Sequence, residues 1–155
     1  MRSTSDQSPE LLPQSERALY LKGIDLFNVG EFFEAHEVWE DIWRPSRNVK
    51  REFFQGLIQC AVALEHLRRG NGRGARRLYD SYLRHFSGVP ETYLGVHIPR
   101  FLHAMEAALR PVLAPNPEPE RGELVLDPSR AILLVVDLVA IPREAAAMEG
   151  SGENL

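Results

Sequence analysis

Apolar residues recur at three- and four-residue spacing over most of residues 15–110, the pattern of amphipathic α-helices. No proline interrupts the chain between Pro13 and Pro45, or between Pro45 and Pro90, and proline is the residue that most strongly breaks a helix. The pattern therefore predicts five helices, at residues 15–28, 31–43, 50–69, 73–87 and 98–110.

A repeat at a spacing of 40 residues divides the first four helices into two similar halves. The equivalent pairs are Phe27 and Leu67, Gly30 and Gly70, Ala35 and Ala75, Trp39 and Tyr79, and Trp43 and Leu83. In each half a helix ends at a glycine, which takes the left-handed backbone conformation that stops a helix. A second helix follows, and its small alanine allows close approach. The alternative is that glycine and alanine recur by chance in any helical hairpin.

Two αα-hairpins are too few for a solenoid. The order of glycine, aromatic and alanine residues over 16–45 resembles one tetratricopeptide unit, but arrays of such units need three or more copies. We therefore expect an all-α fold: a compact bundle of about five helices built on two αα-hairpins with tetratricopeptide-like local packing.

Proline content marks the boundary of the helical domain, which we place at residues 15–110. Residues 111–122, PVLAPNPEPERG, form a proline-rich linker that favours an extended backbone. We expect residues 1–14 and 143–155 to be flexible, as chain ends commonly are.

Residues 123–142 become apolar again, and we expect this C-terminal segment to dock on the helical domain or on a partner. Its stretch Ala131–Ile141 contains β-branched valines, so a short strand and a docking helix both fit. We favour the helix, because Ser129 can cap it and nothing else in the chain offers a sheet partner.

Composition narrows the class of protein. The chain has 155 residues, a formal net charge of −4, and 44% hydrophobic and 26% charged residues, the values of one ordinary globular domain. The lone cysteine, Cys60, excludes an internal disulfide and a cysteine zinc cluster and fits a reducing cytoplasm.

Several partners are disfavoured by the same sequence. The start has no apolar signal core, the longest apolar run is Ala131–Val136, too short for a membrane span, and a mildly acidic chain is a poor bulk nucleic-acid binder. We expect a cytoplasmic protein with no cofactor and no bound metal. Its partner would be another protein or a second copy, engaged through the C-terminal apolar segment.

The densest candidate chemistry lies in Gly30–Arg44, GEFFEAHEVWEDIWR. On a helical wheel His36 falls among Phe32, Trp39 and Trp43. Glu40, one turn on, is the local partner for its imidazole, and Glu37 flanks that edge. The structural interpretation is a core histidine bonded to a carboxylate. The functional one is a pocket in which His36 acts as acid, base or metal ligand and Glu40 orients it.

A polar stripe of Gln55, Gln59 and His66 runs along the otherwise apolar helix predicted at 50–69. If this stripe faces the first hairpin, it completes a small polar pocket. The candidate binding residues are therefore His36, Glu37, Glu40, Trp43, Gln55, Gln59 and His66. We assign none of them a catalytic role.

These segments carry a family resemblance. The chain has an EAHE helix ending in Trp-Arg, a QGLIQ helix, a Gly-Asn turn and a Gly-Ala helix start, at Glu34–Glu37, Gln55–Gln59, Gly70–Asn71 and Gly74–Ala75. This combination, over roughly residues 16–87, resembles the family catalogued as domain of unknown function 309, small all-helical proteins of bacteria and archaea with relatives in plants. The resemblance implies an all-helical fold and brings no established activity, substrate or cofactor.

Two functions of different classes remain. The first is a non-catalytic binding or interaction module, which fits the hairpin architecture and the incomplete catalytic set. The second is a small hydrolase that uses the pocket around His36, Glu40 and Gln59, with or without a metal. An accessible pocket at these side chains would favour the enzyme.

Overall fold

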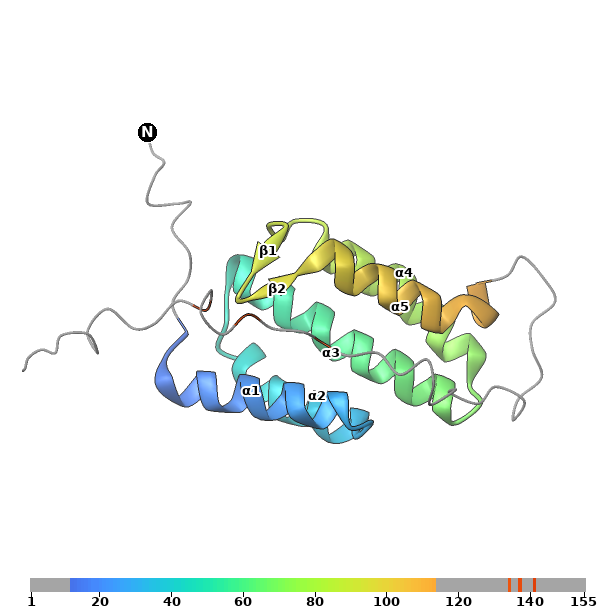
Figure 1. Ribbon diagram of the computed structural model, residues 1–155, viewed down its shortest axis with the longest axis horizontal. Helices are drawn as coiled ribbons and strands as arrows, with labels where there is room; N and C mark the ends of the chain where they lie inside the picture. The colour runs from blue at the N-terminus through green and yellow to red at the C-terminus, as the bar shows by residue number, and fades with distance from the viewer. Residues whose placement is uncertain (1–11, 114–133, 135–136, 138–140, 142–155) are drawn as a thin grey trace, which may run out of the picture.

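The computed structural model describes residues 12–113 together with Leu134, Asp137 and Ile141 (Figure 1). In chain order the elements are α1 (Gln14–Asn28), α2 (Phe32–Trp43), α3 (Asn48–Arg68), α4 (Gly72–Phe86), β1 (Thr92–Tyr93), β2 (Val96–His97) and α5 (Ile98–Leu113). The five predicted helices are confirmed, with no boundary displaced by more than three residues.

The bundle is organised around α3. Helix α3 packs against α2 on one side and α4 on the other, while α1 packs on α2 and α5 on α4. Figure 1 accordingly shows α3 running between the α1–α2 pair and the α4–α5 pair. The apolar residues of α3 are buried nearly all round the helix, as its sequence predicts. The fold is the all-α bundle expected from the sequence.

The 40-residue repeat is real at the level of backbone hydrogen bonds. Gly30 and Gly70 have φ angles of 89° and 78°, the left-handed conformation that favours glycine. After each glycine a backbone N–H donates to the carbonyl five residues earlier, which is a Schellman motif. These bonds join Glu31 to Leu26 at 2.8 Å and Asn71 to His66 at 2.7 Å. Ala35 and Ala75 are both fully buried.

A β-hairpin before α5 was not expected. Tyr93 pairs with Val96 in antiparallel register, and the turn residues Leu94 and Gly95 both have positive φ angles, as in a type I′ turn. The expectation that nothing in the chain offers a sheet partner is therefore wrong. Strands of two residues are too short to leave an alternating sequence pattern.

The end of the chain also differs from expectation. Helix α5 continues to Leu113 with Pro111 inside it, so residues 111–113 are helical and not part of a linker. Leu134, Asp137 and Ile141 are not helical, so the helix favoured for Ala131–Ile141 is wrong at these residues. Residues 114–133, most of 135–142, and residues 1–11 and 143–155 lie outside the described residues.

The described residues of the C-terminal segment form hydrogen bonds with the end of α1 and with the β-hairpin turn. Asn28 bonds the backbone of Leu134, and the Asp137 N–H donates to the Gly95 carbonyl at 2.8 Å. Leu134 and Ile141 are both buried against the core. The described part of the C-terminal segment therefore docks on the helical body.

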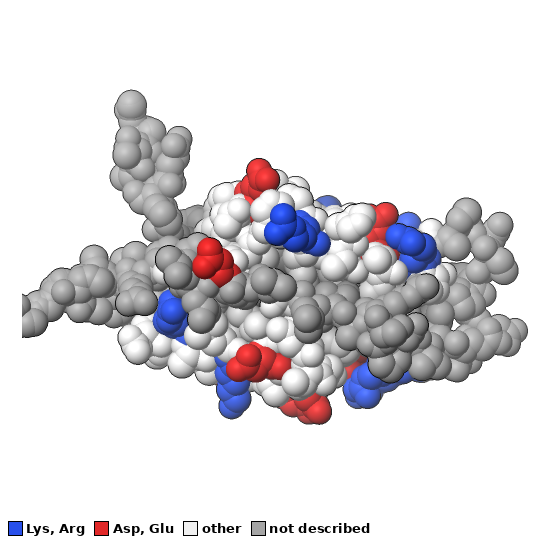
Figure 2. All heavy atoms as spheres, in the orientation of Figure 1, with Lys and Arg blue, Asp and Glu red and all other residues white. Residues whose placement is uncertain are grey.

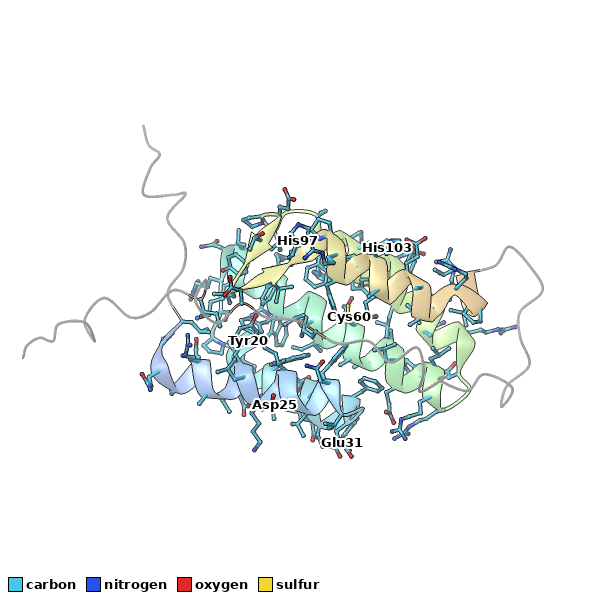
Figure 3. All side chains as sticks on the ribbon, in the orientation of Figure 1. Tyr20, Asp25, Glu31, Cys60, His97 and His103 are labelled. Atoms are coloured by element: carbon cyan, nitrogen blue, oxygen red, sulfur yellow. The ribbon has the colours of Figure 1, made fainter. Side chains whose placement is uncertain are left out.

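Tyr20 and Tyr82 form a matched pair of buried tyrosines that predicts opposite responses to the same substitution. Tyr20, labelled in Figure 3, donates from its hydroxyl to the Leu94 carbonyl at 2.8 Å. The buried hydroxyl of Tyr82 has no hydrogen-bond partner in the described part of the chain. Burial raises the pKa of both hydroxyls, so both stay protonated.

Tyr20→Phe should lower the free energy of unfolding by about 1–3 kcal/mol, because it leaves the buried Leu94 carbonyl unpaired. Tyr82→Phe should change stability little or raise it by up to about 1 kcal/mol, because it removes an unpaired polar group. Urea denaturation of the two variants checks the difference. Equal losses would mean that the Tyr20 hydrogen bond does not form in solution.

Candidate functional site

The buried face of α2 is rotated from the one that the sequence predicts. Its fully or nearly buried residues are Phe32, Ala35, Trp39 and Ile42, whereas Trp43 is only half-buried. Helix α2 packs against both α1 and α3, so its buried arc includes Ala35 and Ile42. Trp43, which the helical wheel places on the same face as Phe32 and Trp39, is therefore not a core residue, and His36 lies at the margin of the core.

His36 makes its polar contacts within its own helix. Its Nδ1 lies 2.6 Å from the Phe33 carbonyl oxygen, so Nδ1 carries a proton and donates. Its Nε2 lies 3.7 Å from a carboxylate oxygen of Glu40, and the Phe33 ring packs edge-on at 4.8 Å. The side chains of His36 and Glu40 are 15% and 32% exposed. The structure therefore brings the predicted pair together at the surface, without locking two hairpins to one another.

The ring of Trp43 lies under the guanidinium group of Arg51, a residue that was not among the candidates from the sequence. The Arg51 guanidinium carbon is 4.1 Å from the centroid of the Trp43 ring, a cation–π contact. The Nη1 of Arg51 also donates to the Trp43 carbonyl at 3.2 Å, which accepts from the Ser46 N–H at 3.0 Å as well. Arg51 thus fixes the α2–α3 connection, and Trp43 is occupied by a structural contact.

The polar stripe of α3 does not converge on His36. Gln55, Gln59 and His66 are all half-buried. No hydrogen bond or ion pair within the described residues joins them to His36 or Glu40, and the buried Oε1 of Gln59 has no partner there. Glu37 is exposed. The candidate set is therefore spread over two helices and has no demonstrated common centre.

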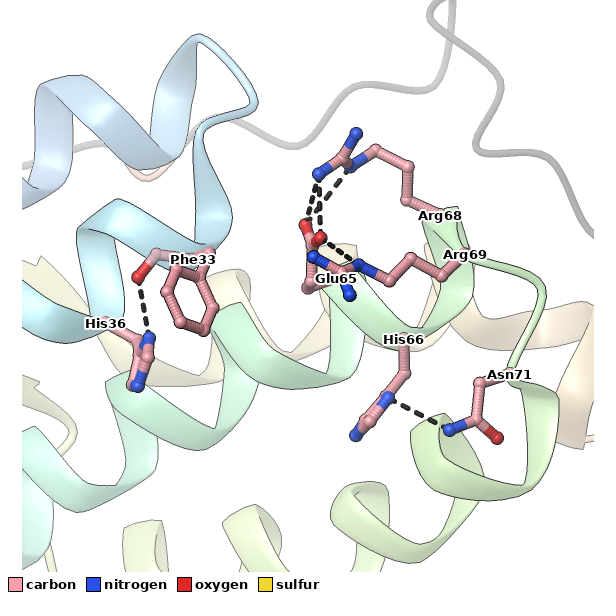
Figure 4. Close-up of polar contacts among 7 residues, drawn as sticks. All are labelled: Phe33, His36, Glu65, His66, Arg68, Arg69 and Asn71. Carbon is pink, nitrogen blue, oxygen red and sulfur yellow. Dashed lines mark hydrogen bonds and ion pairs between the residues drawn. The ribbon is translucent and has the colours of Figure 1, made fainter.

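The side chain of His66, in the last turn of α3, contacts the residue that caps α4. The Asn71 side-chain oxygen accepts from the Gly74 N–H at 3.0 Å and so caps the helix. The Asn71 amide nitrogen lies 3.0 Å from His66 Nδ1, so it donates to an unprotonated Nδ1. Burial and the nearby guanidinium groups of Arg77 and Arg69 lower the pKa of His66. Figure 4 shows His66 turned toward Asn71, well away from His36.

Glu65 is a buried carboxylate that the sequence did not point to. Arg68 donates to both its oxygens, at 2.6 and 2.7 Å, and Arg69 donates at 2.5 Å, as Figure 4 shows. Burial acts to raise the pKa of Glu65, but the two guanidinium groups outweigh it and hold the pKa below its usual value. The arginines three and four residues after Glu65 could have indicated these ion pairs from the sequence. Nothing in the sequence indicated that the Glu65 side chain is buried.

Glu65→Gln should lower stability by about 1–2 kcal/mol at pH 7, discounted because both arginines are largely exposed. A lowered folded-state pKa stabilises the protein above the unfolded pKa of about 4.3. The difference between wild type and variant should therefore shrink as the pH falls through that value, and vanish below the folded pKa. Urea denaturation from pH 7 to pH 3 measures it, with the exposed Glu37→Gln as control. A difference independent of pH would contradict the charged contact.

Two further findings limit the chemistry within the described part of the chain. No group of three or more His, Cys, Asp or Glu side chains there could hold a metal ion. None of the helices there is long and apolar enough to cross a membrane. The arrangement at His36 offers one oriented imidazole beside one carboxylate, with no third reacting group.

Comparison with known proteins gives matches to uncharacterised ones. An uncharacterised protein of Aquifex aeolicus (strain VF5) is 26% identical over 84 residues, 54% of this chain and 25% of that protein. The uncharacterised protein YpuF of Bacillus subtilis (strain 168) is 44% identical over 55 residues, 35% of this chain and 32% of YpuF. The chain thus matches only a minor part of either relative.

A family model described as "Domain of unknown function (DUF309)" matches residues 20–78. The matched segment contains all of α2 and α3 and with them all seven candidate site residues and Glu65. It also contains the turn glycines, Gly30 and Gly70, whose conformations shape the two hairpins. Over residues 20–78 the chain is therefore similar to the DUF309 family, in agreement with the resemblance that its sequence motifs carry.

Proposed function

We propose that the chain is a non-catalytic protein-interaction module whose helical body holds an extended apolar segment of polypeptide. The observation that carries the proposal is the contact between Asn28, the last residue of α1, and the backbone of Leu134. The term docking surface is used below for Asn28 together with the turn residues Leu94 and Gly95.

Asn28 contacts Leu134 as a paired β-strand would. Its amide nitrogen donates to the Leu134 carbonyl at 3.2 Å, and its amide oxygen accepts from the Leu134 N–H at 2.7 Å. One side-chain amide thus satisfies both backbone groups of a single residue. Such main-chain recognition supplies affinity for extended peptides without fixing their side chains.

The second contact lies at the β-hairpin. The Gly95 carbonyl accepts from the Asp137 N–H at 2.8 Å. The neighbouring Leu94 carbonyl is held by the buried Tyr20 hydroxyl, so α1 supports both ends of the docking surface. Leu134 and Ile141 are each 2% exposed. Burial of these two aliphatic side chains stabilises the docked segment by roughly 1.5–3 kcal/mol each, which is more than the hydrogen bonds contribute.

The contacts of the other polar side chains support the same proposal. His36 donates to a carbonyl of its own helix, His66 accepts from the capping residue of α4, and Glu65 is held by two arginines. Each group therefore stabilises local structure. A hydrolase would need them to converge on one reacting centre, so we prefer the interaction module.

Charge supports a protein as the partner. On the face drawn in Figure 2, acidic and basic side chains are interspersed among the described residues, and neither sign forms a continuous patch. A nucleic-acid partner would favour a concentrated basic surface. The free, buried thiol of Cys60 fits our expectation of a cytoplasmic location.

Peptide binding to a full-length variant tests the proposal. Leu134→Asp should keep the chain's own segment off the docking surface, because it would bury a charge. A labelled peptide with the sequence of residues 129–143 should then bind this variant with a Kd on the order of 10 µM. It should bind wild type at least tenfold more weakly, because the attached segment competes at a high effective concentration.

The matched control is the double variant Asn28→Ala with Leu134→Asp, which lacks the amide that contacts the peptide backbone. It should keep its helical circular dichroism and lose peptide binding by at least tenfold. If the peptide bound neither variant, or bound both equally, the docking surface would not be a peptide-binding site.

A further inference from the structure

We propose that two copies of this chain exchange their C-terminal segments, so that Leu134 and Ile141 of one copy fill the docking surface of the other. This inference rests on the proposed function, because it uses the same docking surface. It adds the identity of the partner, which is a second copy of this chain.

Exchange of the segments between two copies would keep every hydrogen bond of the docking surface. Asn28 recognises the backbone of Leu134, and Gly95 accepts from the backbone of Asp137. A segment from a second copy makes the same hydrogen bonds and buries the same two aliphatic side chains. Swapping an identical element is a low-cost route to a dimer for this reason.

The connection between body and segment is long enough for either arrangement. Residues 114–133 separate the end of α5 from Leu134, and a connection of that length can span up to roughly 70 Å when extended. It contains Pro115, Pro117, Pro119 and Pro128. A connection of this length lets the segment reach either its own docking surface or that of a second copy.

Exposed hydrophobic side chains lie next to the docking surface in the sequence. Val29, which follows Asn28 directly, is 72% exposed, and Phe33 at the start of α2 is 46% exposed. These are the large hydrophobic side chains left exposed within the described residues. A second copy that delivers its segment to Asn28 brings protein surface to this same turn, where the two side chains can be buried.

Two variants that damage opposite halves of the contact test the exchange. Asn28→Ala breaks the docking surface and leaves the segment intact. Leu134→Asp breaks the segment and leaves the docking surface intact. Wild type, each variant and their equimolar mixture are compared as full chains by analytical ultracentrifugation and native mass spectrometry, after circular dichroism has shown that each is folded. Arg110→Ala, on an exposed position of α5, controls for the change of one unit of charge.

Exchange predicts a concentration-dependent wild-type dimer. Each variant alone should raise the dimer dissociation constant at least tenfold, and the mixture should recover heterodimers, because one intact segment meets one intact docking surface. A monomeric wild type with heterodimers in the mixture would overturn the exchange and leave the docking, and so the proposed function, in place. A monomeric wild type with no heterodimers would overturn both. A dimer insensitive to both variants would overturn the exchange, because a different surface would then join the copies.

Discussion

Replacing Trp39 with alanine should lower the free energy of unfolding by about 3–5 kcal/mol, the largest loss we expect from any single truncation in this chain. Trp39 is 0% exposed. Its indole N–H donates to the Tyr20 carbonyl at 3.3 Å, and its ring packs against Phe27 at a centroid distance of 6.0 Å. The surrounding helices cannot collapse fully into the space that the indole leaves, so the cavity adds to the lost burial.

Trp43→Ala is the matched control. It should cost about 1–2 kcal/mol, since the side chain is only half-buried and the Arg51 guanidinium lies over its ring. Both values come from urea denaturation followed by circular dichroism, since the fluorescence of each variant changes with the tryptophan removed. A loss for Trp43→Ala equal to that for Trp39→Ala would show that α2 is rotated from the orientation described here.

The helices and their pairing were predictable because their causes are local. Amphipathic spacing, long proline-free stretches and the glycines at 30 and 70 each act over a few residues. The repeat was visible for the same reason, since Gly30 and Gly70 close the same hydrogen-bonded turn in each hairpin. The short β-hairpin escaped prediction, because its turn consists of Leu94 and Gly95, and leucine rarely adopts the positive φ that it has there.

The orientation of α2 could be predicted only in part. The sequence places the aromatic residues on one side of the wheel and so assigns His36 and Trp43 to the core. The neighbouring helices decide otherwise, because α1 and α3 together bury Ala35 and Ile42. The burial of Ala35 agrees with the close approach predicted from the repeat, but the wheel alone does not show that Trp43 is left half-buried.

The candidate site depended on long-range neighbours and was predicted least well. The His36–Glu40 pair follows from a spacing of four residues and is present. The contact of Asn28 with Leu134 joins residues 106 positions apart, and no local pattern encodes it. Gln55 and Gln59 illustrate the same point. Their spacing of four residues places them on one face of α3, but it does not predict which side chains of other helices contact that face.

Gly23→Ala should lower stability by about 3 kcal/mol or more, at the upper end of the cost of overpacking. A Cβ atom at Gly23 would lie 2.1 Å from Trp39 Nε1 and 2.5 Å from Cε2. The indole is fully buried and cannot move aside, so the two helices must separate or the ring must leave its rotamer. Gly88→Ala is the control, because nothing lies within 4 Å of the added atom, and it should be neutral or slightly stabilising.

A double-mutant cycle separates the clash from any effect of alanine on the helix itself. In the interior of an exposed helix, replacing glycine with alanine stabilises the helix by about 1 kcal/mol. In the Trp39→Leu background the indole nitrogen and its neighbours are gone, so Gly23→Ala should become nearly neutral or stabilising there. The coupling between the two positions should then exceed about 2 kcal/mol, well above the few tenths expected of independent sites. If Gly23→Ala cost the same in both backgrounds, the close approach of α1 to the Trp39 ring would not be what requires glycine at position 23. Strong coupling would instead identify this contact as the one that fixes α2 against α1, and with it the placement of Asn28 at the far end of the same helix.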